Sequence, residues 1–209
     1  MKSIYYGIKN FRRHGYIFCL LLISAILLTS CTLFSQGERR NKQAEILFSK
    51  LSTDANYGEN AYQYLEYIQE HLDNRIMGSE QEKNTTEFIV NALLNMGYTQ
   101  ENIKLQTFTI NQDPSEPITQ KPLTNEFLDK SQQNESQNII LTVPGKSDKV
   151  IVVGAHYDSV NTKGVDDNGS GVSVLLESAM RKKDAENPYT IKYIFFGAEE
   201  VGTKGSNYY

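Results

Sequence analysis

Apolar residues recur at helical spacing in three stretches of the chain. The first covers residues 59–72. The second follows Ser79, which we expect to be the N-cap of a helix with Glu82 as its capping-box partner, and it ends at Gly97. The third begins at Ser170. Each pattern predicts an amphipathic helix with one buried face. The apolar positions are Ala61, Leu65, Ile68 and Leu72; Phe88, Ile89, Ala92, Leu93 and Met96; and Val172, Leu175, Leu176 and Ala179.

Four short apolar runs are typical of strands, and a turn signal, Pro144-Gly145, separates the second from the third. Residues 111–137 are polar and predict a long loop. Strands that alternate with a helix after residue 138 favour an α/β domain with helices on the faces of its sheet. In such sheets ligands bind at the carboxyl ends of the strands. The four runs are residues 103–110, 138–143, 149–153 and 191–196.

The N-terminus has the layout of an export signal. Four basic residues precede an apolar run over residues 17–28, which is shorter than the about 20 residues of a membrane span. The run ends in Leu28-Thr29-Ser30-Cys31, which resembles the bacterial lipobox. We therefore expect residues 1–30 to be a lipoprotein signal peptide and Cys31 to carry a lipid that anchors an extracytoplasmic protein, at the cell surface or in the periplasm. An uncleaved membrane anchor and a plain signal peptide with a chance Cys remain alternatives.

Charge and cysteine content limit which partners and which kinds of metal ligand the protein can have. The net charge is −4, and no Lys/Arg cluster follows Arg40, which disfavours nucleic acid as a partner. The two cysteines are Cys19 in the signal and Cys31 at the lipid position, so the mature domain has no thiol. Any metal would be held by His, Asp and Glu. Residues 31–58 are polar and predict a tether.

Three segments in the last 55 residues carry candidate chemistry, and the first follows a predicted strand. His156 and Asp158 are two positions apart, so an extended chain places both side chains on the same side. A carboxylate beside a metal-bound imidazole commonly fixes its tautomer. A buried His that is hydrogen-bonded by a neighbour is the simpler interpretation of this pair alone. His71, at the end of a predicted helix, is interpreted as a surface residue.

The other two segments supply carboxylates. Asp166 and Asp167 precede Asn168-Gly169-Ser170-Gly171 in a glycine-rich turn, where a carboxylate can bridge two cations. Glu199 and Glu200 follow the last predicted strand. One acid of such a pair can bind a metal while the other takes a proton from water. Taken singly, the turn could be a helix cap and the Glu pair a solvated strand end.

Together these segments resemble the secreted zinc aminopeptidase family, whose relatives include glutamate carboxypeptidases and glutaminyl cyclases. The "Gly-Ser-Glu" stretch at residues 76–80 adds to the resemblance. It implies a mixed central sheet flanked by helices, in a zinc-exopeptidase-like (phosphorylase/hydrolase-like) fold that holds two zinc ions, with residues 59–209 as part of the catalytic domain. It also implies these roles: zinc ligands His156, Asp167 (bridging) and Glu200; orienting carboxylate Asp158; and general acid/base Glu199.

The family takes a further Asp and a further His from segments well after the Glu pair. Only nine residues follow Glu200, and His156 is the last His of the sequence. We therefore expect a C-terminally truncated domain, incomplete and inactive by itself, whose other ligands lie beyond Tyr209.

The resemblance implies a metal-dependent exopeptidase, above all an aminopeptidase acting on peptides. A glutaminyl cyclase or amide deacylase, and a non-catalytic lipoprotein or inactive fragment, are alternatives. The oligomeric state is open.

Overall fold

The computed structural model describes residues 36–110 and 135–209. The chain divides into two compact units, Met1–Glu45 and Ile46–Tyr209. The described part of the first unit is helical and belongs to a helix over residues 36–48. The predicted signal peptide, Cys31 and most of the predicted loop (residues 111–134) lie outside the described residues. Within the described residues, no helix combines the length and apolar character that a membrane span requires.

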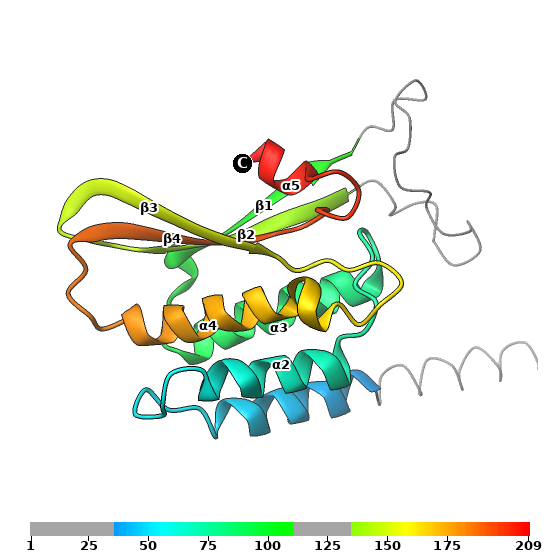
Figure 1. The fold of residues 1–209 in the computed structure, drawn as a ribbon, viewed down its shortest axis with the longest axis horizontal. Helices are drawn as coiled ribbons and strands as arrows, with labels where there is room; N and C mark the ends of the chain where they lie inside the picture. Colours follow the sequence, from blue (N-terminus) through cyan, green and yellow to red (C-terminus); the bar gives the residue numbers. More distant parts are fainter. Residues whose placement is uncertain (1–35, 111–134) are drawn as a thin grey trace, which may run out of the picture. The chain divides into compact units, whose positions relative to one another are not determined.

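The second unit is built on a four-stranded mixed sheet with the strand order β1-β2-β4-β3 (Figure 1). The pairs β1–β2 and β2–β4 are antiparallel, whereas β3 and β4 are parallel. The mixed α/β fold expected from the sequence is thereby confirmed. The strand bounds are β1 Ile103–Thr109, β2 Glu135–Val143, β3 Ser147–His156 and β4 Tyr189–Phe196.

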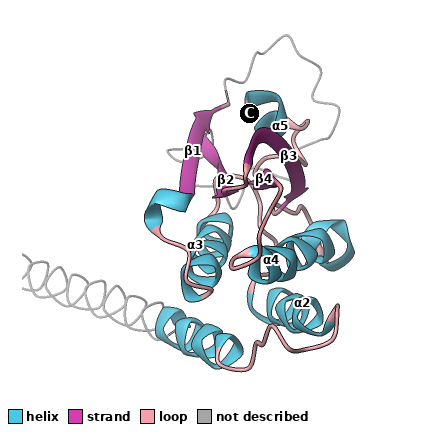
Figure 2. Cartoon of the chain, turned by 90° about the vertical axis from the view of Figure 1, so that its left-hand side faces the viewer, coloured by secondary structure: helices cyan, strands magenta, loops and turns pink. Residues whose placement is uncertain are grey.

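Three helices lie on one side of the sheet and a short fourth lies on the other (Figures 1 and 2). The crossover between the parallel strands β3 and β4 is α4, as parallel pairing requires. It packs on the sheet, and α2 packs against it from outside. The helix bounds are α2 Glu59–His71, α3 Glu80–Asn95, α4 Ser170–Lys182 and, on the opposite side, α5 Lys204–Tyr208.

The core contains most of the apolar positions that the sequence pattern predicts. Leu65, Leu175 and Met96 are only half-buried, and Tyr64 and Tyr67 join the core from α2. His71, interpreted from the sequence as a surface residue, is half-buried at the end of α2, where its ring lies 4.7 Å from that of Tyr67. The fully or nearly fully buried apolar residues include Ile68, Leu72, Ile89, Leu93, Ile139, Leu141, Leu176, Ala179, Ile194 and Phe195.

Of the two hydrogen bonds in the predicted capping box, one forms and the other does not, so the prediction is wrong in that part. The Ser79 side chain accepts a hydrogen bond from the Glu82 amide, as expected. The Glu82 carboxylate, however, does not return to the Ser79 amide. It accepts from the Gly78 amide (2.6 Å) and from the Ser136 hydroxyl (2.5 Å). The strand β2 starts three residues earlier than predicted, and this earlier start brings Ser136 against α3.

Part of the predicted tether is fastened to α4. Glu177 is buried, and its carboxylate accepts hydrogen bonds from the amides of Gly58 and Ala61 at the start of α2. A carboxylate at a helix N-terminus is stabilised by the helix dipole. Arg181, one turn further along α4, donates to backbone carbonyls of residues 53, 55 and 56. Residues 53–58 therefore belong to the folded domain.

Candidate active site

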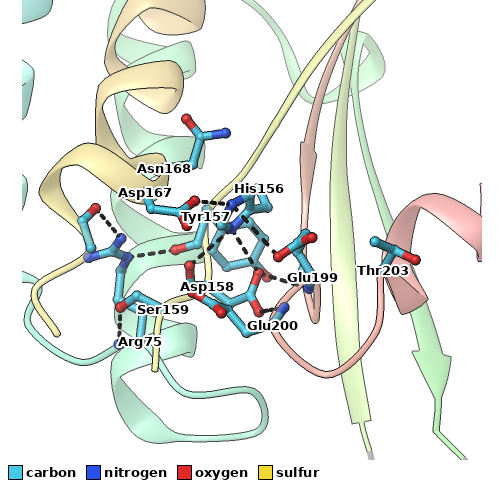
Figure 3. Close-up of polar contacts among 12 residues, drawn as sticks. Arg75, His156, Tyr157, Asp158, Ser159, Asp167, Asn168, Glu199, Glu200 and Thr203 are labelled. Carbon is cyan, nitrogen blue, oxygen red and sulfur yellow. Dashed lines mark hydrogen bonds and ion pairs between the residues drawn. The ribbon is translucent and has the colours of Figure 1, made fainter. Parts of the chain in front are cut away.

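The three candidate segments meet at the carboxyl ends of the strands, as the sequence predicts (Figure 3). His156 is the last residue of β3 and pairs in register with Phe196, the last residue of the parallel strand β4. Glu199 and Glu200 follow in the turn after β4. Asp167 approaches from the turn at Val165–Gly169, directly before α4. Residues far apart in the sequence are thereby brought to the carboxyl ends of two adjacent strands.

Both ring nitrogens of His156 face oxygen atoms. Nδ1 lies 3.2 Å from the backbone carbonyl oxygen of Asp158. Nε2 lies 2.8 Å from Oδ1 of Asp167 and 3.9 Å from Oε2 of Glu199. Burial lowers the pKa of the imidazole, but the carboxylates of Asp158, Asp167 and Glu199 raise it more, to about 9. Without a metal, the contact with Asp167 requires a proton on Nε2, the position that a cation would take.

Asp158 is fully buried, and its carboxylate is bound mainly to the Glu199-Glu200 turn. Oδ1 accepts from the Glu199 amide and Oδ2 from the Glu200 amide, each at 3.0 Å. Oδ1 also lies 3.6 Å from Nδ1 of His156, an ion-pair distance. The predicted orientation of the imidazole thus involves both the carbonyl and the carboxylate of Asp158. Its hold on the turn joins residues more than 40 positions apart, which sequence spacing does not reveal.

A second buried side chain holds the same turn. The Oδ1 atom of Asn138 accepts from the Gly197 amide (3.2 Å), and its Nδ2 donates to the Gly205 carbonyl (2.8 Å). Gly197 has no room for a side chain, because a Cβ there would lie 2.6 Å from the Gln137 carbonyl oxygen. Sequence reasoning missed Asn138. The sequence signal that could have found it is a polar amide residue at the start of the apolar run Ile139-Ile140-Leu141. The structure buries this amide completely, and buried amides form hydrogen bonds.

Glu82 is a buried acid that sequence reasoning placed in a helix cap. Burial raises the pKa of its carboxyl to about 7, although the bonds from Ser136 and Gly78 oppose the shift. The side chain lies beneath the turn, because a Cβ at Gly197 would approach its Oε1 atom within 3.2 Å. Glu82 therefore titrates near neutral pH behind the candidate site.

This titration predicts a pH-dependent stability. Between pH 4.5 and about 7 the folded chain retains a proton on Glu82 that the unfolded chain has released. The stabilisation that this proton provides is therefore fully present below pH 4.5. As pH rises through 7 it is lost, and the free energy of unfolding falls by about 3 kcal/mol. Urea unfolding of the metal-free wild type and of Glu82→Gln from pH 4 to 8 measures it. If the difference in unfolding free energy between the wild type and Glu82→Gln stayed constant with pH, it would contradict the prediction.

The donors at the site have the chemistry of a zinc site, with one imidazole and several carboxylates. Asp167 and Glu199 expose 78% and 38% of their side chains, whereas His156 exposes 10%, so solvent reaches the site from the side of the two carboxylates. Burial raises the pKa of Glu200, and the nearby carboxylates of Asp158 and Asp167 raise it further, a repulsion that a cation would relieve. In the described part of the chain, no three His, Asp or Glu side chains form a complete metal-binding cluster.

Known proteins share both the sequence and the fold. Residues 138–209 match the model of peptidase family M28. Aminopeptidase YwaD of Bacillus subtilis is 40% identical over 104 residues, which cover 48% of this chain and 23% of that protein. The chain thus spans about a quarter of that curated relative.

The fold is also found in solved structures of low sequence identity. A zinc aminopeptidase from Bacillus subtilis has a TM-score of 0.57 at 19% identity, over 73% of this chain and 64% of that one. Porphyromonas gingivalis glutaminyl cyclase has a TM-score of 0.57 at 23% identity, over 74% and 53%. These structures establish the fold. Residues 138–209 are thus similar in sequence to peptidase family M28, and the described domain has a zinc-exopeptidase-like fold.

Proposed function

We propose that this chain belongs to a zinc-dependent aminopeptidase and supplies part of its active site. The observation that carries the proposal is the contact of 2.8 Å between His156 Nε2 and Asp167 Oδ1, with Glu199 at 3.9 Å, at the carboxyl ends of β3 and β4. The curated relative is named an aminopeptidase. His156, Asp167 and Glu200 would hold zinc, and two ions are proposed for the complete site.

The side chains have distinct tasks in this proposal. Zinc, when bound, supplies a Lewis acid that polarises the scissile carbonyl and makes water more acidic. Glu199 takes a proton from the attacking water and delivers it to the leaving amine, because its carboxylate is exposed beside His156 and is not a member of the His156–Asp167 pair. Asp158 holds Glu199 and Glu200 in place through their amides. The peptide substrate approaches from the solvent-exposed side of Asp167.

Substrate comparison tests the proposal. The complete protein to which this chain belongs is assayed with and without added zinc on an aminoacyl p-nitroanilide, its N-acetylated form and a peptide with N-terminal glutamine. An aminopeptidase releases nitroaniline only from the free-amine substrate, and a chelator abolishes the release. Conversion of the glutaminyl peptide to its cyclic product alone would favour a glutaminyl cyclase. Equal cleavage of the acetylated substrate would favour an amide deacylase. Absence of bound zinc would favour a non-catalytic protein.

We also propose that lipid on Cys31 anchors the protein outside the cytoplasm. The support is the basic, apolar and lipobox-like order of residues 1–31. In a bacterial host, the wild type is expected to incorporate labelled palmitate and to fractionate with membranes. Cys31→Ser is expected to lose the label. Equal labelling of the two proteins would contradict the lipobox interpretation.

A further inference from the structure

A buried arginine lies behind the site, in the connection between α2 and α3. Arg75 is 1% exposed. Its guanidinium donates four hydrogen bonds, all to backbone carbonyls: those of Tyr157 (2.6 Å), Leu72 (2.9 Å), Lys163 (2.6 Å) and Gly164 (3.0 Å). Among the described residues, no carboxylate lies within salt-bridge distance of it; its known hydrogen-bond acceptors are all main-chain atoms.

Three of the four acceptors bracket the loop that joins two proposed zinc ligands, and the fourth, Leu72, is the C-cap residue of α2. Tyr157 directly follows His156, and Gly164 comes three residues before Asp167 (Figure 3). The backbone of Arg75 contacts the middle of the same loop. Its amide donates to the Ser159 hydroxyl (3.0 Å), and its carbonyl accepts from the Ser159 amide (3.2 Å). One residue therefore holds the beginning, middle and end of the loop.

The loop itself is shaped to receive the guanidinium. Gly164 has a φ of 52°, and a Cβ there would lie 2.7 Å from Nη2 of Arg75. Ser159 is fully buried, and its hydroxyl donates to the Thr162 carbonyl (3.2 Å), which closes the loop on itself. The planar fork of arginine reaches several acceptors in fixed directions at once. A lysine ammonium keeps the charge but has no such fork.

We propose that Arg75 is a positioning residue that fixes the loop of residues 157–164 and thereby sets the separation of His156 and Asp167. The identity of these two residues as zinc ligands rests on the proposed function. The hold on the loop does not, because the contacts that define it join protein atoms only.

Two arginine-to-lysine variants of the full chain test this role. Arg181 is the matched control, since it too donates to three backbone carbonyls, but in the segment of residues 53–56. Amide hydrogen exchange is measured first on the metal-free proteins. Arg75→Lys is expected to accelerate exchange of residues 157–164 by about 10-fold, whereas Arg181→Lys accelerates exchange only around residues 53–61. Unchanged exchange of residues 157–164 in Arg75→Lys would overturn the proposal.

Zinc affinity is measured next in the complete protein to which this chain belongs, by competition with a chromophoric chelator. Arg75→Lys is expected to lose about 10- to 100-fold in affinity, and Arg181→Lys to keep the wild-type value. An equal loss in both variants would overturn the proposal, since general destabilisation would then explain it. A wild type that binds no zinc would contradict the proposed function, while the exchange rates still decide the hold on the loop. If Arg75→Lys does not fold, Ser159→Ala is compared with Ser206→Ala in both measurements, with the same outcomes.

Discussion

In the complete protein to which this chain belongs, replacement of Glu199 by glutamine is expected to lower kcat for aminoacyl nitroanilide hydrolysis by about 10²- to 10⁴-fold while the zinc content stays unchanged. Glutamine keeps the size and the backbone amide of Glu199, so the hydrogen bond to Asp158 is preserved. It cannot accept a proton from water. KM is expected to change little, because the substitution removes proton transfer and no binding contact. Steady-state kinetics and metal analysis of the same samples measure the effect.

The neighbouring Glu200 provides a matched control. Glu200→Gln is expected to lower zinc occupancy first and activity as a result, because its carboxylate lies among other carboxylates whose repulsion a cation relieves. Excess zinc should then restore part of the activity of Glu200→Gln and none of that of Glu199→Gln. Full activity in Glu199→Gln would disprove its role as general base. Loss of zinc from Glu199→Gln would make it a ligand instead.

Asp158→Asn is expected to reduce the unfolding free energy of the metal-free chain by about 2–4 kcal/mol. The carboxylate of Asp158 is fully buried and accepts two amide hydrogen bonds. An asparagine offers one oxygen, and its amino group meets the second amide donor without an acceptor between them. Zinc affinity should fall by about 10- to 100-fold as well, because the turn that carries Glu200 loses its support.

Urea unfolding at constant pH checks this prediction, with Asp148→Asn as the control. Asp148 is an exposed acid near the start of β3, the strand that ends two residues before Asp158, so its substitution removes the same charge and keeps the buried contacts. We expect less than about 0.5 kcal/mol for the control. Equal unfolding free energies in the two variants would mean that the amide contacts of Asp158 contribute nothing measurable.

The sequence was sufficient for the features that depend on local pattern. The helical spacing from Ser170 onward predicted α4, and the apolar run before His156 predicted β3, although β3 extends further at both ends. The order of elements along the chain suggested that His156 and Glu199 lie at the same end of the sheet. The parallel alignment of β3 and β4 places both residues at the carboxyl ends of these strands. Because each prediction rests on spacing within about fifteen residues, local physics is enough to make it.

Contacts between distant segments could not be predicted in this way. The side chain of Glu82, on α3, sits at capping-box spacing, yet it bonds to Ser136 on strand β2. Arg75 precedes a recognisable Gly-Ser-Glu stretch and shows no pattern of its own, although it bonds to a loop more than 80 residues away. Asn138 looks like the polar edge of an apolar run. Such roles depend on which elements become neighbours in three dimensions.

The strand order has a consequence for how this domain is made. The strand β4 lies between β2 and β3, although it is the last of the four in the sequence. A growing chain therefore carries two strands that follow each other across a short turn but do not pair with each other, because each pairs with residues 189–196. Until that segment emerges, one edge of β2 and one edge of β3 lack their partner and are open to wrong pairing. The arrival of β4 completes the sheet and the pairing of His156 with the Glu199-Glu200 turn in one event.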